Sequence, residues 1–200
     1  MALVTAAEAR LAIPALTSTG EDSNLDTLIA RADAFLAAWC GYPPASAGGV
    51  ATFEDVTYTM ILDGPGGAEL VLPVGPLVSV TSVHSDPLRE YGSDVLVASG
   101  DYTLDSYRSL VILDNDSTQG AWDTGYRAIK IVYVAGFATV PADIKQATLG
   151  MVSHWWRLRR QAGKKSVSQE GGSVSLLEET IPAQVAQLLG PYRLAEVCFG

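Results

Sequence analysis

The stretch VPADIKQATLGMVSHWWRLRRQ, residues 140–161, is the segment around which the rest of the chain can be understood. Its Pro141 suits the first turn of a helix, and Asp143 places a negative charge near the positive end of the helix dipole. Apolar residues then recur three or four positions apart, as on one face of a helix: Ile144, Ala147, Met151, Val152, Trp155 and Leu158. Because Gly163 ends the pattern, we expect a long amphipathic helix with Trp155 on its apolar face.

The C-terminal end of this helix is cationic. Five of the chain's 13 lysines and arginines lie at this end: Arg157, Arg159, Arg160, Lys164 and Lys165. Cations are favourable at a helix C-terminus, so the cluster has a purely local explanation. A second interpretation, contact with an acidic partner or with DNA passing nearby, stays open.

Two adjacent tryptophans also lie in this helix. Trp155 and Trp156 project about 100° apart, so one can enter the core while the other faces elsewhere. Either both rings are absorbed by the same fold, or one lies at a subunit interface, where tryptophan is enriched.

Composition bounds the protein class. Of the 200 residues 48% are hydrophobic, which is enough for a substantial core. The net charge of −9 argues against general nucleic-acid binding. Cys40 ends an apolar helix face and is expected to be a buried small side chain, so we do not expect a disulfide with Cys198 or a zinc site. Neither a signal peptide nor a membrane-spanning run is visible, and we expect a soluble protein made in a cytoplasm.

Three further helices are expected. Thr5 and Glu8 have the spacing of a capping box, which predicts a short helix to about Ile13. A longer helix begins at Asp22 or Ser23 and ends before Gly41, with apolar positions at helical spacing: Leu25, Leu28, Ile29, Ala32, Phe35, Leu36 and Trp39. The third runs from Pro182 to about Leu189. Between 162 and 179, a stretch rich in Gly, Ser and Lys is expected to form a mobile loop or arm.

The middle of the chain has a β pattern instead. Runs rich in Val, Thr, Tyr and Leu are broken by turn residues, which predicts strands near 53–62, 69–73, 77–84, 94–97, 101–104, 109–113 and 128–134. The glycine-rich residues 63–67 are expected to form a hairpin turn. We therefore predict an α+β fold, a bundle of N- and C-terminal helices with a small antiparallel β module inserted between them. The expected parts are 1–44, the β module 45–137, and 138–200, which would pack with 1–44.

Patterns that carry chemistry are largely missing. His84 and His154 have no Cys, Asp or Glu at metal-ligand spacing on the same element. Residues 63–67 lack the Lys and the Ser or Thr of a phosphate loop, and the acidic turn 114–116 lacks the Gly and the distal Glu of a calcium loop. No nucleophile elbow is present, and the scattered carboxylates single out no catalytic pair. We expect no enzyme activity, no cofactor and no metal.

Several short segments, taken in their order along the chain, form a pattern that can be compared with known protein families. In chain order they are Leu3–Val4–Thr5, Trp39–Cys40–Gly41, Pro76–Val83, Asp101–Asp105, Val132–Phe137, Val140–Ala147, His154–Trp155, Ile181–Pro182 and Leu188–Arg193. This succession resembles the head–tail connector (adaptor) proteins of long-tailed double-stranded DNA bacteriophages, over nearly the whole chain. The stretch 162–180 departs from the resemblance, because it is longer and richer in Gly and Ser.

The resemblance implies a structural protein of the virion neck, assembled in the host cytoplasm. Such proteins form a ring, often of twelve copies, below the portal protein. The ring extends the DNA channel and docks the tail or stopper protein, and DNA passes through without specific binding. No cofactor and no membrane are implied, and the C-terminal region would lie against the portal. The candidate interface residues are Trp155, Trp156, Arg157, Arg159, Arg160, Lys164, Lys165, Leu188, Leu189, Tyr192 and Arg193.

Two alternatives stay open. The β module could belong to a ligand- or receptor-binding phage structural protein, which would need an exposed aromatic platform. The candidates for that platform are Tyr58, Tyr91, Tyr102, Tyr107, Trp122 and Tyr126. A hydrolase with dispersed carboxylates is the least supported alternative.

Overall fold

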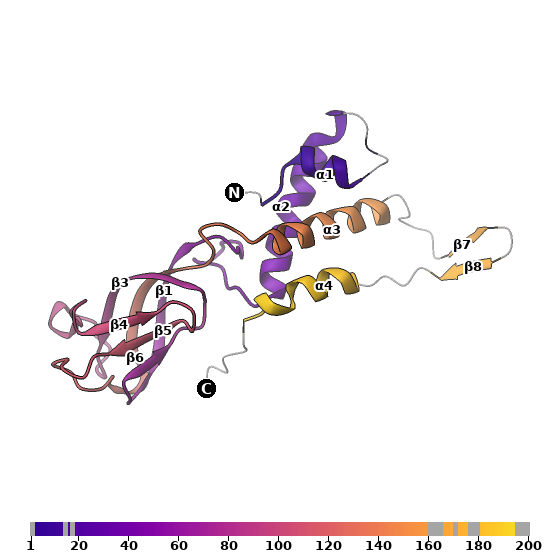
Figure 1. Ribbon diagram of the computed structural model, residues 1–200. Helices are drawn as coiled ribbons and strands as arrows, with labels where there is room; N and C mark the ends of the chain where they lie inside the picture. The colour runs from indigo at the N-terminus through magenta and orange to yellow at the C-terminus, as the bar shows by residue number, and fades with distance from the viewer. Residues whose placement is uncertain are drawn as a thin grey trace. The chain divides into compact units, whose positions relative to one another are not determined.

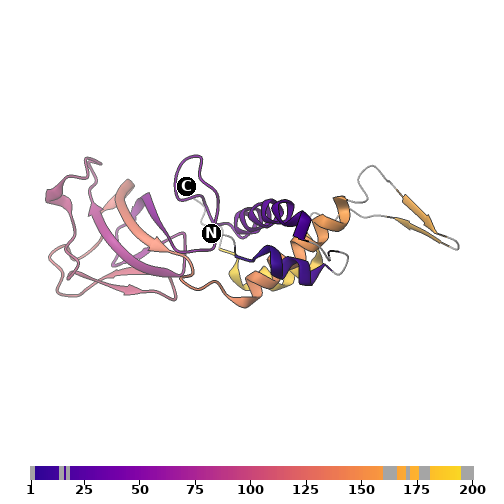
Figure 2. The same ribbon diagram turned by 90° about the horizontal axis from the view of Figure 1, so that it is seen from above.

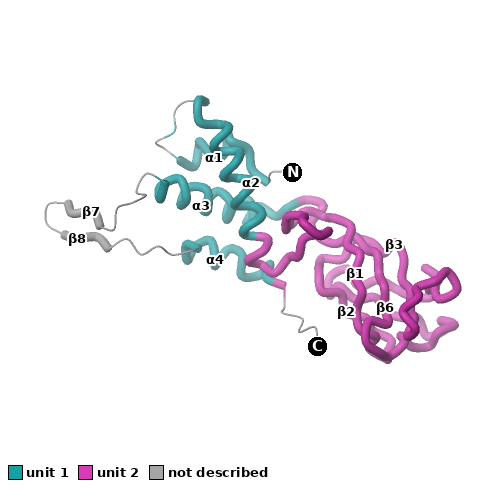
Figure 3. The backbone as a smooth tube through the Cα atoms, turned by 180° about the vertical axis from the view of Figure 1, so that it is seen from behind, with its two compact units in different colours: residues 1–36, 140–193 teal, residues 37–139, 194–200 magenta. Residues whose placement is uncertain are grey.

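A computed structural model of the chain describes residues 3–13, 16, 19–159, 166–169, 172–175 and 181–194. The chain is α+β, as predicted, with both helices and antiparallel sheets. It divides into two compact units (Figure 3): unit 1 comprises residues 1–36 and 140–193, and unit 2 comprises residues 37–139 and 194–200. Each unit has its own core and is described by itself. Among the described residues, no helix is both long enough and apolar enough to cross a membrane.

Unit 1 is helical. Its α-helices are α1 (Ala6–Ala12), α2 (Asp22–Trp39, of which residues 22–36 belong to this unit), α3 (Ala142–Arg159) and α4 (Ala183–Leu189), with 3₁₀ turns η1 (Thr19–Glu21) and η3 (Gly190–Tyr192). The capping box of α1 is confirmed, because the Glu8 N–H donates to Thr5 Oγ1 at 3.2 Å and the Thr5 N–H donates to Glu8 Oε2 at 2.8 Å. These two bonds satisfy backbone donors that the first turn leaves without partners.

The helices of unit 1 gather around α3 (Figures 1 and 2). α1 and α4 both pack against it. At the crossing of α3 and α4, a Cβ added to Gly150 would lie 3.0 Å from Val185 Cγ2, so the missing side chain lets the two helices approach closely. Val185 and Leu189 of α4 are buried in this contact. The short α4 is therefore held by tertiary packing, which a helix of its length needs.

A polar clamp joins three segments of unit 1. The Thr148 hydroxyl of α3 is fully buried and donates to Asp33 Oδ1 of α2 at 3.0 Å. The Leu3 N–H donates to Asp33 Oδ2, also at 3.0 Å. One carboxylate thus ties the start of the described chain, α2 and α3 together, and it satisfies a hydroxyl that would be costly to bury alone.

The described residues of unit 2 form six strands in two antiparallel sheets. They are β1 (Val56–Pro65), β2 (Glu69–Val71), β3 (Leu77–Ser85), β4 (Tyr102–Asp105), β5 (Leu110–Leu113) and β6 (Thr124–Ala135). One sheet has the order β1-β6-β3 and the other β2-β5-β4. In β6 the buried residues alternate after Ala128, and Tyr133 stacks near Tyr58 of β1 with 5.7 Å between ring centres. Burial raises the pKa of the Tyr133 hydroxyl.

Two sequence expectations for unit 2 are wrong. Residues 94–97 are not a strand, because Ser93–Val95 form a 3₁₀ turn (η2) and Leu96 makes a single bridge to His84. Residues 63–67 do not close a hairpin, because β1 and β2 belong to different sheets. Residues 63–65 instead extend β1 along β6, and the chain then passes to the other sheet through Gly66 and Gly67. In both cases the local sequence pattern does not determine whether a segment pairs with another strand, or with which one.

The predicted arm is described only in part. β7 (Ser166–Gln169) and β8 (Gly172–Ser175) pair antiparallel, with Gln169 opposite Gly172. The remaining residues of the predicted arm lie outside the described residues.

The loop after β3 is organised by one carboxylate. Asp86 is 4% exposed. Its side-chain oxygens accept the backbone N–H groups of Leu88 at 2.7 Å, Glu90 at 2.6 Å and Tyr91 at 2.8 Å. These hydrogen bonds, that of Tyr91 foremost, hold the pKa of Asp86 below its usual value against the opposing effect of burial. The bonds also stabilise the left-handed backbone at Arg89 and Tyr91, where φ is 66° and 53°.

We expect the stabilising effect of this carboxylate to depend on pH. Because the folded-state pKa is lowered, the contribution is present above the unfolded pKa of about 3.9 and is lost as pH falls through the lower folded value. Asp86→Asn should therefore lower the melting temperature clearly at pH 7 and much less at pH 3. Thermal unfolding followed by near-ultraviolet circular dichroism measures both differences. Asp116→Asn, at an exposed turn position, is the matched control, and an equal loss for Asp86→Asn at both pH values would contradict the explanation.

Candidate assembly surface

The central helix follows the sequence expectation except at its tryptophans. Expected over 140–161, α3 spans Ala142–Arg159, and four of the predicted apolar residues are buried: Ile144, Ala147, Met151 and Val152. The tryptophan on this buried face is Trp156, which is 6% exposed, whereas Trp155 is half-buried. Apolar spacing alone places Trp155 on the apolar face, and the structure buries Trp156 more deeply than Trp155.

The reason lies in one row of residues four positions apart. Ile144, Thr148, Val152 and Trp156 form this row, and all four are buried. Thr148 is polar, so a search for apolar residues at helical spacing does not recognise this row. Its hydroxyl is satisfied by Asp33, so the position is nevertheless buried. A search for apolar residues alone therefore follows the neighbouring row to Trp155.

Both tryptophan rings have partners inside unit 1. The Trp155 ring centre lies 5.6 Å from that of Phe35 in α2, and the Arg31 guanidinium carbon lies 5.9 Å from the Trp155 ring centre. The Arg159 guanidinium carbon lies 4.6 Å from the Trp156 ring centre. A guanidinium positioned above the face of an aromatic ring is attracted by the ring's electrons, which is a cation–π contact.

The basic cluster separates into members with different surroundings. Arg159 Nη2 lies 3.5 Å from the Glu21 carboxylate, so its charge is compensated within unit 1. Arg157 is exposed, and its Nε donates to the Ser153 carbonyl of the same helix at 3.3 Å. Arg160, Lys164 and Lys165 lie outside the described residues. Among the described residues, no carboxylate is recorded within 4 Å of the exposed Arg157 guanidinium.

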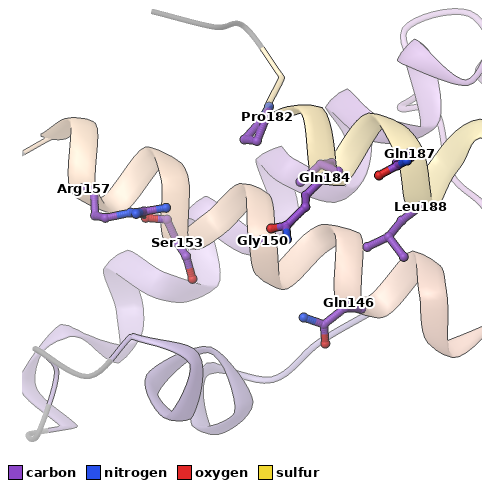
Figure 4. Close-up of a pocket in the computed structure, with 9 residues that line it drawn as sticks. Gln146, Gly150, Ser153, Arg157, Pro182, Gln184, Gln187 and Leu188 are labelled. Atoms are coloured by element: carbon purple, nitrogen blue, oxygen red, sulfur yellow. Dashed lines mark hydrogen bonds between the residues drawn. The ribbon is translucent and has the colours of Figure 1, made fainter. Parts of the chain in front are cut away.

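A groove of about 460 Å³ lies between α3 and α4 (Figure 4). α3 supplies Gln146, Gly150, Ser153 and Arg157, and α4 with its N-cap supplies Pro182, Gln184, Val185, Gln187 and Leu188. Arg157 and Leu188, two of the predicted interface residues, are brought to this groove from different helices. The close contact between Gly150 and Val185 sets the distance between its walls.

The other described members of the predicted interface set lie outside the groove lining. Leu189 is fully buried in the core. The Tyr192 hydroxyl donates to Asp143 Oδ2 at 3.4 Å, and partial burial together with the Asp143 charge raises the pKa of Tyr192. Arg193 is exposed beyond η3. The structure thus gathers two predicted residues into the groove and assigns Leu189 a packing role.

Sequence reasoning missed the uncharged polar residues that line the groove. Gln146, Ser153, Gln184 and Gln187 carry no motif, and they become a set only because α3 and α4 lie side by side. The available signal is weak: exposed amides recur on two helices that were both expected to be amphipathic. Side-chain amides donate and accept hydrogen bonds, which suits the backbone of an extended peptide.

The groove has the chemistry of a docking surface. Among its described lining residues the charged one is Arg157, and the apolar contribution comes from Pro182, Val185 and Leu188. An arginine can hold a carboxylate through two parallel hydrogen bonds. Among the described residues, no group of His, Cys, Asp and Glu could hold a metal ion. The lining residues that the structure describes include neither a paired acid and base nor an activated nucleophile.

The aromatic platform expected for the alternative function does not form as a set. Tyr58 and Trp122 are 1% exposed, and the Trp122 Nε1–H donates to the Ala68 carbonyl at 2.9 Å inside unit 2. Tyr107 and Tyr126 are exposed. The Tyr91 hydroxyl donates to the Arg127 carbonyl at 2.6 Å. Tyr58 and Trp122 therefore serve the core and cannot contribute to a surface for a ligand.

Solved structures of other proteins share this fold. A solved structure described as the neck of an empty GTA particle, computed with C6 symmetry, shares the fold with a TM-score of 0.58 and 18% identity, over 99% of this chain and 93% of the other. A chain from the virion of a native gene transfer agent (GTA) particle gives a TM-score of 0.56 and 18% identity, with the same coverage. At this identity the likeness concerns the fold alone. No curated protein matches the chain.

The family comparison is more specific. The family described as "Head completion protein" matches residues 3–195, nearly the whole chain. This match confirms the predicted resemblance to structural proteins of the phage head–tail region. The chain therefore belongs to the head completion protein family.

Proposed function

We propose that the protein assembles as a ring of copies at the neck of a phage or phage-like particle. The ring would lie between the portal and the tail or stopper protein and would extend the DNA channel. The observation that carries this proposal is the family match over residues 3–195. The fold is also shared with a chain of a structure described as a particle neck. That each ring contains twelve copies remains a prediction.

The surface chemistry supports a structural role. The groove between α3 and α4 offers one cation and several amides, which suits protein contacts. The net charge of −9 suits a channel through which DNA slides without binding, because like charges repel. Among the predicted contact residues, we propose Arg157 and Leu188 as members of an assembly surface, because both line the groove.

The test is assembly with the portal protein of the same particle. We expect the mixture to contain a rotationally symmetric ring attached to the portal, visible by electron microscopy, with a mass by light scattering that gives the number of copies. A chain ending at Leu194 retains α4 and η3 and is the matched variant for docking of the C-terminal residues. It should bind the portal more weakly at an unchanged melting temperature. A full-length protein that stays monomeric beside assembled portal would overturn the proposal.

A further inference from the structure

Cations are scarce in unit 2, and most of them gather at one place. Residues 37–139 contain twelve aspartates and glutamates but four lysines and arginines. Three of these four, Arg89, Arg127 and Lys130, lie around one tyrosine. The Tyr91 hydroxyl donates to the Arg127 carbonyl at 2.6 Å, and the Lys130 Nζ lies 5.6 Å from the Tyr91 ring centre. Among the described residues, no carboxylate is recorded within 4 Å of any of these three cations.

The backbone that carries these cations is held in place by carboxylates. Arg127 has a left-handed backbone with φ 55°, and its N–H donates to Asp63 Oδ1 at 2.7 Å. Asp86 holds the left-handed Arg89 and Tyr91 in the same way, through the N–H groups of the loop after β3. Left-handed residues other than glycine cost folding energy, and they cluster at binding sites. A surface that is already ordered loses little entropy when a partner binds.

Four exposed side chains on these two backbone segments form what we call the cationic patch: Leu88, Arg89, Tyr126 and Arg127. Leu88 is 77% exposed and Tyr126 is 64% exposed. The described hydrogen bonds of Arg89 and Arg127 use backbone atoms, so both guanidinium groups can each hold a carboxylate through parallel N–H donors. Arginine and tyrosine are enriched at protein interfaces. The patch therefore fits an acidic protein surface.

Such an acidic surface lies on the other sheet at the same end of unit 2, where β1 and β5 end and β6 begins. The Asp114 N–H donates to the Asp101 carbonyl at 2.9 Å, which brings these two acids together. Their described side-chain partners are hydroxyls, from Thr103 to Asp114 at 2.6 Å and from Thr118 to Asp101 at 3.1 Å. Asp116 is exposed beside them. We call Asp101, Asp114 and Asp116 the acidic turn, and its charge has no described cation within 4 Å.

We propose that the cationic patch of one copy of this chain binds the acidic turn of a second copy, with Arg127 facing Asp116. This inference rests on the proposed ring assembly. Patch and turn are different surfaces, so the contact is heterologous, and heterologous contacts are the kind that close into rings. Each copy carries one patch and one turn, so it can bind a neighbour on either side. Leu88 and Tyr126 supply the apolar part of the contact.

Charge reversal tests the contact in the full-length chain. Arg127→Glu places acids against acids, and Asp116→Arg places bases against bases. Each variant should weaken association of copies by at least about tenfold in analytical ultracentrifugation, at an unchanged melting temperature. An equal mixture of the two variants should associate again, because every patch then meets a turn of opposite charge. The doubly substituted chain should associate by itself for the same reason.

The matched controls lie at the opposite end of the strands of unit 2. Arg108→Glu reverses the remaining cation of residues 37–139, and Asp55→Arg reverses an exposed acid, so both should leave association unchanged. Recovery by the double variant without recovery by the mixture would place the pair within one copy and would overturn the inference. Loss of portal binding by Arg127→Glu with unchanged association would also overturn it, because the patch would then bind the portal.

The failure of this inference and the failure of the ring proposal give different results. A ring that assembles on the portal equally well with Arg127→Glu would overturn the inference and leave the ring in place. If the wild-type protein stays monomeric beside the portal, the ring proposal fails, and nuclear magnetic resonance of the isolated protein still measures the contact. Amide signals of residues 88–91, 114–116 and 126–127 should shift with protein concentration, and about 1 M salt should abolish these shifts. Shifts that persist in Arg127→Glu would show that charge does not make the contact.

Discussion

Replacing Trp156 with alanine is expected to lower the free energy of unfolding of unit 1 by about 3–5 kcal/mol. The ring is 6% exposed and ends the buried row of α3. Its removal leaves a cavity and takes away the aromatic face beneath the Arg159 guanidinium. Urea unfolding followed by circular dichroism at 222 nm, which is dominated by the helices, measures the loss.

Trp155→Ala is the matched control for this prediction. The half-buried Trp155 loses its contacts with Phe35 and Arg31, which should cost about 1–2 kcal/mol. The two variants remove the same side chain from adjacent positions, so their difference reports the deeper burial of Trp156 together with the different partners of the two rings. A larger loss for Trp155→Ala would restore the interpretation drawn from apolar spacing, with Trp155 in the core.

Replacing Gly136 with alanine is expected to destabilise unit 2 by about 3 kcal/mol or more. Gly136 has φ +123°, a conformation that side chains with a Cβ rarely adopt. An added Cβ would collide with the Glu54 carbonyl oxygen and would lie 2.7 Å from its carbon and 2.9 Å from Asp55 Cα. Because the obstacle is backbone on both residues, relief requires the Glu54–Phe137 bridge to open. Thermal unfolding followed in the near ultraviolet measures the change in this unit.

Gly125→Ala separates steric collision from backbone strain. Gly125 lies in β6, the strand that ends one residue before Gly136, and has φ +141°, but nothing lies within 4 Å of an added Cβ. The substitution should cost about 1–2 kcal/mol through strain alone. If both alanine variants melted at the same temperature, the close approach of Glu54 to Gly136 would have no energetic weight.

Features encoded locally could be predicted from the sequence. The capping box of α1 depends on two residues three positions apart, and it forms as expected. The bounds of α2 and α3 follow helical spacing and agree with the structure within a few residues. Most strands of unit 2 were also located, because β-branched runs between turn residues are a short-range signal.

Features that depend on distant partners could not be predicted in this way. Thr148 is buried because Asp33 lies opposite it, 115 positions away in the chain, and that pair decides which tryptophan is buried. The strand assignment at 94–97 failed because Ser93–Val95 form a 3₁₀ turn and Leu96 makes only a single bridge to His84 among the described residues. The groove is defined by Gly150 and Val185, whose contact appears only once α4 packs on α3.

The division of unit 1 between two stretches of the chain has a consequence for biosynthesis. Residues 1–36 are translated before their partner helix α3, which begins only at Ala142. The six described strands of unit 2 are translated in between. Their sheets can therefore form while Leu25 and Ile29 are still exposed, because α3 has not yet been made. During that interval the nascent chain exposes the apolar face of α2. Slower translation near residue 140 should therefore increase the dependence of the nascent chain on chaperones.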